Sequence, residues 1–341
     1  MSIDNNANIS EGKISIAVLK EYDAVPSGIS LIQGGTIKTV WRIGTGKGSL
    51  CLKRLKQPYD KALFSVNAQI YIKNSGGNVP GIISNKKGEA ITEYNGQLFV
   101  LYEWIEGTGL DFNNPSDLKN ALLGLALFHN FSKGYVPADG SKISSKLGKW
   151  PEQYESMLSR LDSWVEIAKA KVSQPNFSTY GKLTASVVDI GRMALKEIKT
   201  SAYEELSAVG SNSIVLCHQD YGKGNALLTD KGVYVLDLDG VTFELPARDL
   251  RKIIGKAAEN KNNWQMEKIN EIVNWYEQGS PMSKAEKKIL YIDLLFPHWY
   301  YGLVKNLFQA GKPVKAFEIE RIAMLELSKI PLLKTLLRRS E

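Results

Sequence analysis

The sequence contains few of the residues that form disulfide frameworks or structural zinc sites. Its 341 residues include 2 cysteines, Cys51 and Cys217, and 3 histidines. Two cysteines cannot form a disulfide framework, and a reducing compartment suits them as buried hydrophobic residues. Cysteine and histidine are also too few and too scattered to form a structural zinc site. We therefore expect hydrophobic cores to stabilise the chain.

The sequence also lacks the long apolar runs of membrane proteins. No run reaches the length needed to span a bilayer. Residues 1–13 are polar and rich in asparagine, without the basic and apolar regions of a signal peptide. We therefore expect cytoplasmic synthesis, a flexible segment over 1–13 and no membrane insertion.

Basic residues are in excess but are not concentrated. The net charge is +7, and the lysines are spread over the whole chain without a long basic block or a nucleic-acid motif. The charge is interpreted either as a solvated basic surface or as an attraction for an anion such as a nucleotide phosphate. No nucleic acid partner is expected.

Residues 14–105 have the pattern of a β-rich lobe with one helix. Gly34-Gly35 lies between two apolar runs, which predicts a hairpin, and the alternation in Gly48–Leu55 predicts a strand. Helical periodicity from about residue 60 to residue 73 predicts the helix. Residues 96–105 are almost continuously apolar, which predicts a buried strand.

Helical patterns dominate residues 106–341. Asn114-Pro115-Ser116 is typical of a helix start. Further helices are predicted over 151–172, 182–207, 247–260, 264–278, 283–310 and 315–329. A short β-like segment, 213–239, interrupts them. The sequence therefore predicts a β-rich N-terminal lobe over 14–105 and a larger helical C-terminal lobe over 106–341, with a ligand site in the cleft between them.

The segment from Val215 to Gly240, VLCHQDYGKGNALLTDKGVYVLDLDG, contains the residue types that phosphoryl transfer requires. Two apolar runs flank Asp230-Lys231-Gly232, which predicts a β hairpin. Asp220 precedes the first strand, Asn225 begins it and Asp237 ends the second. Phosphoryl transfer needs a carboxylate that orients a hydroxyl and accepts its proton, and oxygen ligands for Mg²⁺. We assign Asp220 as the catalytic base, and Asn225 and Asp237 as metal ligands, in the order of the kinase signature.

Neighbouring residues have more than one interpretation. Asp239 is either a second metal ligand or a solvated residue at the end of a strand. His218 is interpreted as a structural histidine that braces the catalytic loop, and Cys217 as a core residue. Asp249 begins a helix, and either caps that helix or braces the catalytic loop.

The N-terminal lobe offers groups that suit a nucleotide. Because side chains alternate along a strand, one member of the Lys-Arg pair at residues 53–54 should face the cleft, and the lysine suits the α- and β-phosphates. The Gly-Gly-Thr turn offers backbone N–H groups and a hydroxyl to phosphate. The backbone that follows the last strand could hydrogen-bond an adenine edge. The residues predicted to contact the nucleotide are Gly34, Gly35, Thr36, Lys53, Glu103 and Ile105.

Taken together, the chain resembles the aminoglycoside phosphotransferase and choline kinase family, a branch of the protein-kinase-like fold. HQDYGKGN matches that family's His-x-Asp-x-x-x-x-Asn loop, VLDLDG its metal-binding segment, LYEWIEG its hinge and LGLALFH the helix that follows. CHQDYGKGN, the GKW at residues 148–150 and the overall length are most similar to the CotS-type spore coat proteins of endospore-forming bacteria. The resemblance implies an α+β, bilobal protein-kinase-like fold, with a small antiparallel N-terminal lobe and a catalytic hairpin in the helical lobe.

One residue of the kinase pattern is missing. The kinase plan pairs the nucleotide lysine with a glutamate on the following helix, but no glutamate lies between Lys53 and Gly88. Gln69 is the candidate to orient Lys53, through a hydrogen bond weaker than a charged pair. We therefore expect modest turnover, and a lysine that is loosely held or leans towards Asp237.

Aromatic residues of the helical lobe serve either as core or as part of an acceptor site: Trp264, Trp275, Tyr276 and the run 297–302. In an acceptor site they could stack on a sugar or a quaternary amine. The lobe lacks the dense acidic cluster that a polycationic aminoglycoside would need, which argues against antibiotic resistance as the function.

Two functions are compatible with these observations. One is a kinase that uses Mg²⁺ with ATP or GTP and phosphorylates a hydroxyl of a small molecule, a sugar or an amino alcohol. The other is a structural spore coat protein that keeps the kinase fold with little or no turnover. The resemblance adds other spore coat proteins as partners, and deposition in the spore coat after cytoplasmic synthesis.

Overall fold

The computed structural model describes residues 12–33 and 39–340. The predicted phosphate-binding turn of Gly34, Gly35 and Thr36 lies outside the described residues. The chain forms two compact units. The first contains the residues up to Ser144 together with Asp220–Thr242, and the second contains Ser145–Gln219 and the residues from Phe243 onward. The boundary predicted at residue 105 separates a nucleotide-binding lobe from a lobe with the catalytic loop and acceptor site. The two compact units do not test that division of roles, so it stays a prediction.

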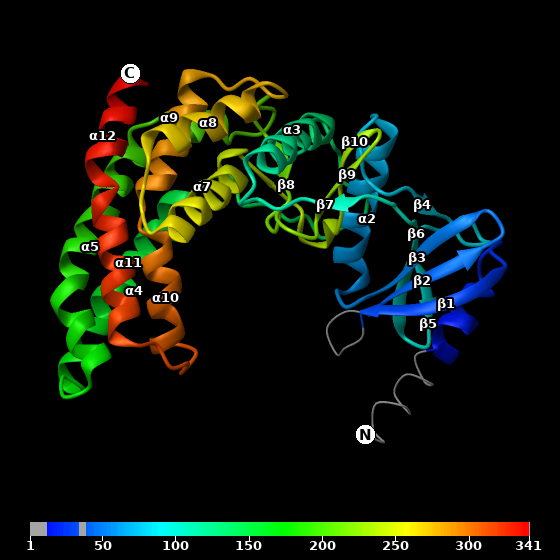
Figure 1. Cartoon of the computed structure of the whole chain (residues 1–341), viewed down its shortest axis with the longest axis horizontal. Coiled ribbons are helices and arrows are strands. Elements are labelled where there is room, and N and C mark those ends of the chain that lie inside the picture. Colours follow the sequence, from blue (N-terminus) through cyan, green and yellow to red (C-terminus); the bar gives the residue numbers. More distant parts are fainter. Residues whose placement is uncertain (1–11, 34–38, 341) are drawn as a thin grey trace. The chain divides into compact units, whose positions relative to one another are not determined.

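The first unit is built on a six-stranded antiparallel sheet (Figure 1). Its strands, in spatial order, are β1 (Pro26–Gln33), β2 (Thr39–Thr45), β3 (Gly48–Leu55), β6 (Gln97–Glu103) and β4 (Ile82–Ile83), and β5 (Thr92–Tyr94) also pairs with β6. The antiparallel pairing of β1 with β2 confirms the hairpin predicted around residues 34–35. The strand predicted over 96–105 is β6, whose central residues are buried.

Alternation along the strands gives this sheet two apolar faces. On one face, Trp41 packs against Val18, which belongs to a short helical stretch over residues 12–19. On the other face, Tyr102 packs in a cluster with residues of α2 (Tyr59–Asn74), the helix predicted from the periodicity of residues 60–73. The sheet is thus covered on both sides, which fixes the direction in which each strand residue points.

A smaller, three-stranded sheet of the first unit holds the segment predicted to be catalytic. Its strands are β10 (Gly232–Val235), β9 (Ala226–Thr229) and β7 (Thr108–Gly109). The β9–β10 pair is the predicted antiparallel hairpin. It packs against α3 (Pro115–Ser132), where a Cβ atom on Gly124 would lie 2.7 Å from Val233. The side chain of Asn114 accepts hydrogen bonds from the first turn of α3, which confirms the predicted helix start.

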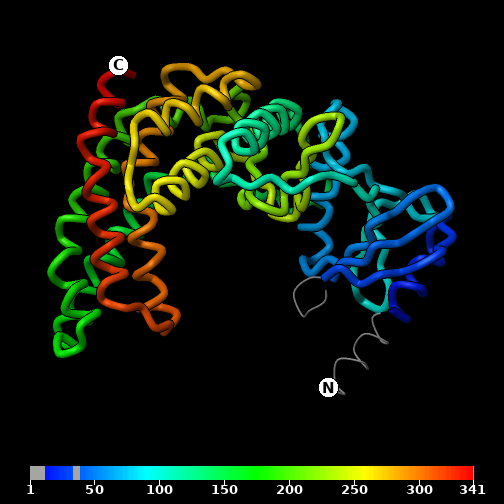
Figure 2. Tube along the Cα trace, in the orientation of Figure 1, coloured from blue at the N-terminus to red at the C-terminus, as the bar shows by residue number. Residues whose placement is uncertain are grey.

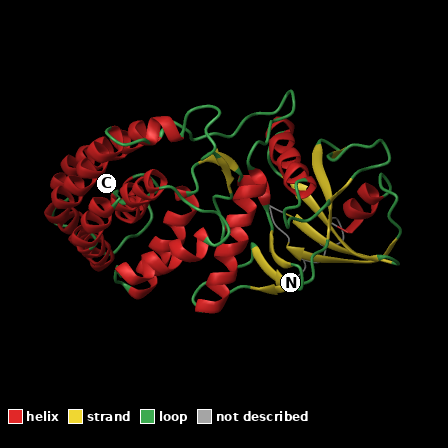
Figure 3. Cartoon of the chain, turned by 90° about the horizontal axis from the view of Figure 1, so that it is seen from above, coloured by secondary structure: helices red, strands yellow, loops and turns green. Residues whose placement is uncertain are grey.

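The second unit is mainly helical (Figures 2 and 3). Its helices are α4 (Trp150–Ala170), α5 (Pro175–Lys199), α6 (Tyr203–Leu206), α7 (Ala247–Lys261), α8 (Met266–Glu277), α9 (Lys284–Leu295), α10 (His298–Phe308), α11 (Ala316–Ser328) and α12 (Ile330–Arg339). Strands β8 (Val215–Cys217) and β11 (Thr242–Glu244) form a two-stranded sheet. Helix α5 packs along α4 and α11. Among the described residues, no helix is both long and apolar enough to cross a bilayer.

Prolines explain three of the differences between these helices and the predicted ones. The helix predicted over 283–310 is two helices, α9 and α10, because Pro297 cannot donate the backbone hydrogen bond that would join them. The helix predicted from residue 182 begins earlier, with Pro175 in its first turn. Helix α12, which the sequence pattern did not predict, also has a proline, Pro331, in its first turn. A first-turn proline is compatible with a helix, because its missing N–H would have no partner there.

Candidate active site

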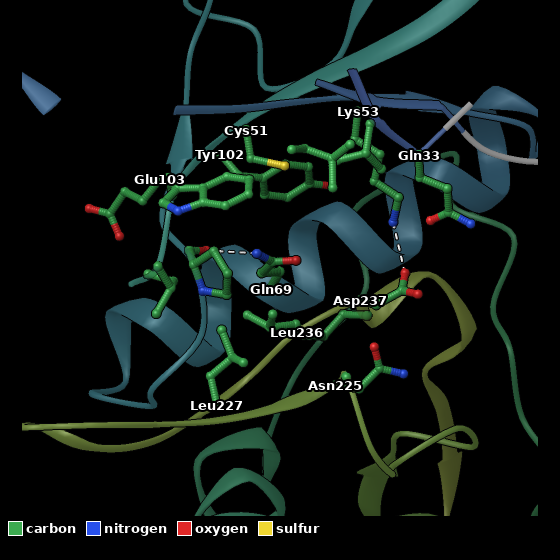
Figure 4. Close-up of a pocket in the computed structure, with 17 residues that line it drawn as sticks. Gln33, Cys51, Lys53, Gln69, Tyr102, Glu103, Asn225, Leu227, Leu236 and Asp237 are labelled. Carbon is green, nitrogen blue, oxygen red and sulfur yellow. Dashed lines mark hydrogen bonds and ion pairs between the residues drawn. The ribbon is translucent and has the colours of Figure 1, made fainter. Parts of the chain in front are cut away.

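A pocket of about 320 Å³ lies within the first unit (Figure 4). Residues of β3 and β6 line one side of it, and residues of the β9–β10 hairpin line the other. The lining residues are Ile32, Gln33, Val40, Cys51, Lys53, Gln69, Pro80, Tyr102, Glu103, Trp104, Ile105, Gly224, Asn225, Leu227, Leu236, Asp237 and Leu238. A volume of this size is at the lower end of the range for small-molecule sites. Five of the predicted site residues therefore line one pocket.

Lys53 points into this pocket. Its Nζ atom lies 2.8 Å from Oδ1 of Asp237 and 2.6 Å from Oδ1 of Asp239. Burial of the ammonium acts to lower its pKa, but the two carboxylates outweigh burial and raise the pKa of Lys53 above its ordinary value. Arg54 points the other way, and its guanidinium donates to Thr39. The predicted proximity of Lys53 to Asp237 is confirmed.

A left-handed residue brings both carboxylates to the lysine. At the base of the hairpin, the Leu236 N–H donates to the Asn225 carbonyl at 2.9 Å. Asp237 follows with a φ of 63°, and a 3-10 turn, Leu238–Gly240, comes next. A non-glycine residue in this region is uncommon, although aspartate adopts it more readily than most, and such residues cluster at functional sites. The turn allows Asp237 and Asp239 to contact the same ammonium.

Asp220, the predicted base, lies beside Asn225 but is exposed and is not among the residues that line the pocket. The Asn225 Nδ2 atom donates to the Asp220 carbonyl at 2.9 Å. The next residue, Tyr221, anchors the loop, because its hydroxyl donates to the carbonyl of Ala121 at 2.7 Å. The residue before the aspartate, Gln219, also has a left-handed backbone, with a φ of 71°. The loop around Asp220 is thus anchored at Tyr221 and has a strained backbone at Gln219.

In the second unit, Asp249 braces the chain that leads to Asp220. Its carboxylate accepts hydrogen bonds from the backbone N–H groups of His218, at 2.6 Å, and Gln219, at 3.0 Å. Of the two roles considered for Asp249, the structure supports the brace, and Pro246 occupies the cap position of α7. His218 is buried. Cys217 is a core residue as predicted, fully buried, with its thiol donating to the Leu245 carbonyl.

Glu103, the last residue of β6, was predicted to contact the nucleotide, and its carboxylate has a structural role. The Glu103 side chain accepts from the Gly81 N–H at 2.8 Å and from Lys73 at 3.0 Å. Burial acts to raise the pKa of Glu103, but the Gly81 hydrogen bond and Lys73 outweigh it and lower the pKa below its ordinary value. The Glu103 N–H also donates to the Gly81 carbonyl. Glu103 and Ile105 line the pocket, and base recognition by their backbone stays a prediction.

The expectation that Gln69 orients Lys53 is wrong. Gln69 is buried and lines the pocket, but its Nε2 atom donates to the Pro80 carbonyl at 2.6 Å. That carbonyl belongs to a bend after α2 and would otherwise be a buried acceptor without a partner, which is costly. Asp239 is the second acid that contacts Lys53, in addition to Asp237. It was predicted to be either a metal ligand or a solvated residue, and not a partner of the lysine.

Most of the aromatic residues considered for an acceptor site belong to the core. Tyr276 and Tyr300 are fully buried, and Tyr301 and Trp264 are each 7% exposed. Trp299 differs, because it is only partly buried and packs against α7, where a Cβ atom on Gly255 would lie 1.8 Å from its ring. Within the run 297–302, Trp299 is therefore the aromatic residue whose side chain is partly packed and partly exposed.

Solved kinase structures resemble this fold over almost its whole length. An aminoglycoside phosphotransferase from Alicyclobacillus acidocaldarius has a TM-score of 0.73 at 15% identity, and covers 95% of this chain and 96% of its own. An amicoumacin kinase, solved with AMP-PNP and Ca²⁺, has a TM-score of 0.60 at 14% identity, covering 96% and 95%. A choline kinase from Cryptosporidium parvum has a TM-score of 0.56 at 13% identity, covering 95% and 97%. The predicted α+β, protein-kinase-like fold is confirmed.

Sequence comparison gives a narrower relationship. Spore coat protein S of Bacillus subtilis is 24% identical over 293 residues, which covers 86% of this chain and 84% of that protein. The family described as "Spore coat putative kinase YutH" matches residues 62–326. Both findings agree with the predicted resemblance to kinase-like spore coat proteins. Because the match covers most of the chain, the protein belongs to this spore coat kinase-like family.

Proposed function

We propose that this chain binds a nucleotide with Mg²⁺ in the pocket of the first unit and transfers a phosphoryl group to a hydroxyl of a small molecule, such as a sugar or an amino alcohol. The observation that carries the proposal is the contact of Lys53 with Asp237, at 2.8 Å, in a pocket that Asn225 also lines. A kinase needs a cation for the phosphates and oxygen ligands for the metal in one place. ATP and GTP are both candidate donors.

The residues present suit Mg²⁺. Asn225 uses its amide nitrogen to bind the Asp220 carbonyl, which leaves its amide oxygen for a metal. The side chains of Asp237 and Asp239 are 26% and 35% exposed, so both carboxylates can be reached from solvent. Carboxylate and amide oxygens are the ligands that Mg²⁺ prefers. Bound there, the ion would offset the negative charge of the phosphates, and the nucleotide and Ca²⁺ in the amicoumacin kinase structure support this assignment.

The chain's own residues have distinct roles in this proposal. Asp220 orients the acceptor hydroxyl and takes its proton. Lys53 exchanges its carboxylate partners for the α- and β-phosphates. The apolar side chains of Leu227 and Leu236 lie against the base, and the backbone of Glu103 and Ile105 binds its polar edge.

A structural coat protein with little turnover is the second candidate, and one observation favours it. Helix α2 has no glutamate, and Gln69 does not hydrogen-bond Lys53. Among the described residues, the acidic partners of the lysine are therefore the two carboxylates also proposed to bind metal. Metal binding would therefore compete with the lysine for the same oxygen atoms. Such competition would slow phosphoryl transfer without affecting the fold.

The family and the similarity to spore coat protein S support a location in the spore coat. We propose synthesis in the cytoplasm, deposition in the coat and contact with other coat proteins there. This location is compatible with either candidate function, since a coat-associated protein can retain a kinase activity.

The experiment that separates the two candidates is single-turnover phosphoryl transfer from γ-labelled ATP and GTP to a library of hydroxyl acceptors. The wild type should transfer label to at least one acceptor, and Asp220→Ala should lose the transfer by about 10²–10⁴-fold, the range for general acid–base catalysis. If wild type and Asp220→Ala are equally inert while both bind nucleotide, the structural function is correct.

A further inference from the structure

The two carboxylate partners of Lys53 are not equivalent. The Nζ atom of the lysine lies 2.6 Å from Oδ1 of Asp239 and 2.8 Å from Oδ1 of Asp237. Asp237 lines the pocket together with Asn225, and Figure 4 shows both beneath the lysine. Asp239 contacts the same ammonium but is not among the residues that line the pocket. A metal ion bound in the pocket with the nucleotide would therefore meet Asn225 and Asp237 first.

The turn that carries Asp239 is fixed within the first unit. The Val241 N–H donates to the Leu238 carbonyl at 3.2 Å, which closes the 3-10 turn that contains Asp239. Directly after the turn, Thr242 is buried, and its hydroxyl accepts from the Ser144 hydroxyl at 2.7 Å. The backbone at Asp239 thus has a defined place before any ligand binds. A residue that orients another side chain needs such support.

The same turn packs against α2. In the kinase plan, the helix that follows the strand of the nucleotide lysine supplies the glutamate that pairs with that lysine. Helix α2 follows β3 in this way but has no glutamate, and its Gln69 donates to the Pro80 carbonyl instead. The Asp239 carboxylate reaches Lys53 from a turn that lies against this helix. An acid next to α2 thus occupies the position that no acid of α2 itself fills.

The ammonium can keep one carboxylate and still bind phosphate. Lys53 is only 6% exposed, so it depends on protein groups rather than on water for hydrogen bonds. An ammonium has three N–H donors. With Asp237 bound to Mg²⁺, the contact with Asp239 occupies one donor and leaves the others for phosphate oxygens.

We infer that Asp239 is the positioning residue for Lys53, in the role that the helix glutamate has in other kinases. The metal ligands are then Asp237 and Asn225. This inference rests on the proposed function and refines it, because Asp237 is exchanged for the phosphates while Asp239 stays in contact with the lysine. The metal and the lysine then use different carboxylates, so the competition that would favour a structural coat protein does not arise.

The test is a double-mutant cycle on the affinity of the full-length protein for ATP and GTP in the presence of Mg²⁺, measured by calorimetry. The four proteins are wild type, Asp239→Asn, Lys53→Met and the double variant. Asp239→Asn should weaken binding of the tighter nucleotide by about 10-fold, because the lysine loses its charged partner. In the Lys53→Met background, the same substitution should cause no further loss, since Asp239 acts through the lysine.

Three variants serve as comparisons. Asp237→Asn should weaken binding in both backgrounds, because a metal ligand acts without the lysine. Asp239→Glu keeps the carboxylate and should bind nucleotide more tightly than Asp239→Asn does. Asp230→Asn removes an equal charge from an exposed residue of the same hairpin and should leave the affinity unchanged.

The outcomes separate this inference from the proposed function. An equal loss of affinity from Asp239→Asn in both backgrounds would identify a metal ligand or a purely structural residue, and would overturn the inference. Unchanged affinity of Asp239→Asn in the wild-type background would overturn it as well. Both results leave the proposed function standing, because the wild type binds nucleotide in each. A wild type that binds neither nucleotide would count against the proposed function itself.

Discussion

Glu244 provides a quantitative test of the buried centre of the second unit. The side chain is fully buried and accepts from the Trp150 indole N–H at 2.9 Å and from the Leu245 N–H at 3.0 Å. Burial raises the pKa of Glu244 from 4.5 to about 7, and Asp293 adds to the increase, while the two hydrogen bonds and Arg248 oppose it. The folded protein therefore holds this proton more tightly than the unfolded chain does.

The consequence for stability has a defined sign and pH range. A raised pKa in the folded state means that the charged form is disfavoured there. The free-energy penalty for ionising Glu244 in the folded protein is absent below pH 4.5. The penalty grows as the pH rises towards 7 and is constant above that pH. At 1.36 kcal/mol per pKa unit, the full penalty is about 3 kcal/mol. Trp150 and Leu245 donate to different oxygens of Glu244, so Glu244→Gln removes the charge but also one of the two acceptors, a loss of about 1–3 kcal/mol at any pH. Relative to wild type, the variant should therefore be more stable at pH 8 than at pH 5, by about 2–3 kcal/mol.

Urea unfolding of wild type and Glu244→Gln at pH 5 and pH 8 measures this difference. The difference in stability between variant and wild type should shift in favour of the variant between pH 5 and pH 8. Glu152→Gln, at an exposed residue of α4, is the control and should show no pH-dependent difference. An effect of Glu244→Gln that is the same at both pH values, or that becomes more destabilising from pH 5 to pH 8, would refute the raised pKa of this carboxyl.

Three further substitutions test the first unit. Lys53→Met should weaken nucleotide binding by about 10- to 100-fold, since hydrogen bonds to charged groups contribute about 1.5–3 kcal/mol, and calorimetry with unchanged affinity would contradict this. Gln69→Glu should lower the free energy of unfolding in urea by about 1–3 kcal/mol, because it removes the donor to the Pro80 carbonyl, and should not increase phosphoryl transfer. Faster phosphoryl transfer in this variant would mean that residue 69 can orient Lys53. Gly124→Ala should lower stability by about 1–3 kcal/mol, because its Cβ would lie 2.7 Å from Val233; an unchanged melting temperature would mean that the hairpin can move away.

The catalytic segment was predictable because its signals are local. The turn at residues 230–232 fixes the hairpin, and Asn225 and Asp237 flank its two strands, so their proximity follows from the pairing of β9 with β10. Strand alternation likewise separated Lys53 from Arg54. These features depend on spacings of two to about twenty residues, which a single sequence displays directly.

Contacts between distant segments could not be predicted in the same way. The Lys53–Asp239 contact depends on the left-handed backbone of Asp237, a conformation that aspartate tolerates but that its sequence neighbours do not specify. Gln69 bonds to Pro80 because the chain bends back beneath α2 at that point. Arg251 of α7 and Asp293 of α9 form an ion pair although they are 42 residues apart in the sequence (293 − 251). Neither residue belongs to a recognisable motif.

The central claim is that the pocket around Lys53 and Asp237 binds a nucleotide together with Mg²⁺. Calorimetric titration of the full-length protein with ATP and with GTP, with and without Mg²⁺, tests it most directly. We predict binding that Mg²⁺ strengthens for at least one nucleotide, and a loss of at least about 10-fold of the Mg²⁺-dependent part in Asp237→Asn, equivalent to about 1.4 kcal/mol. Absence of binding at millimolar nucleotide, or binding that neither Mg²⁺ nor Asp237→Asn alters, would contradict the claim.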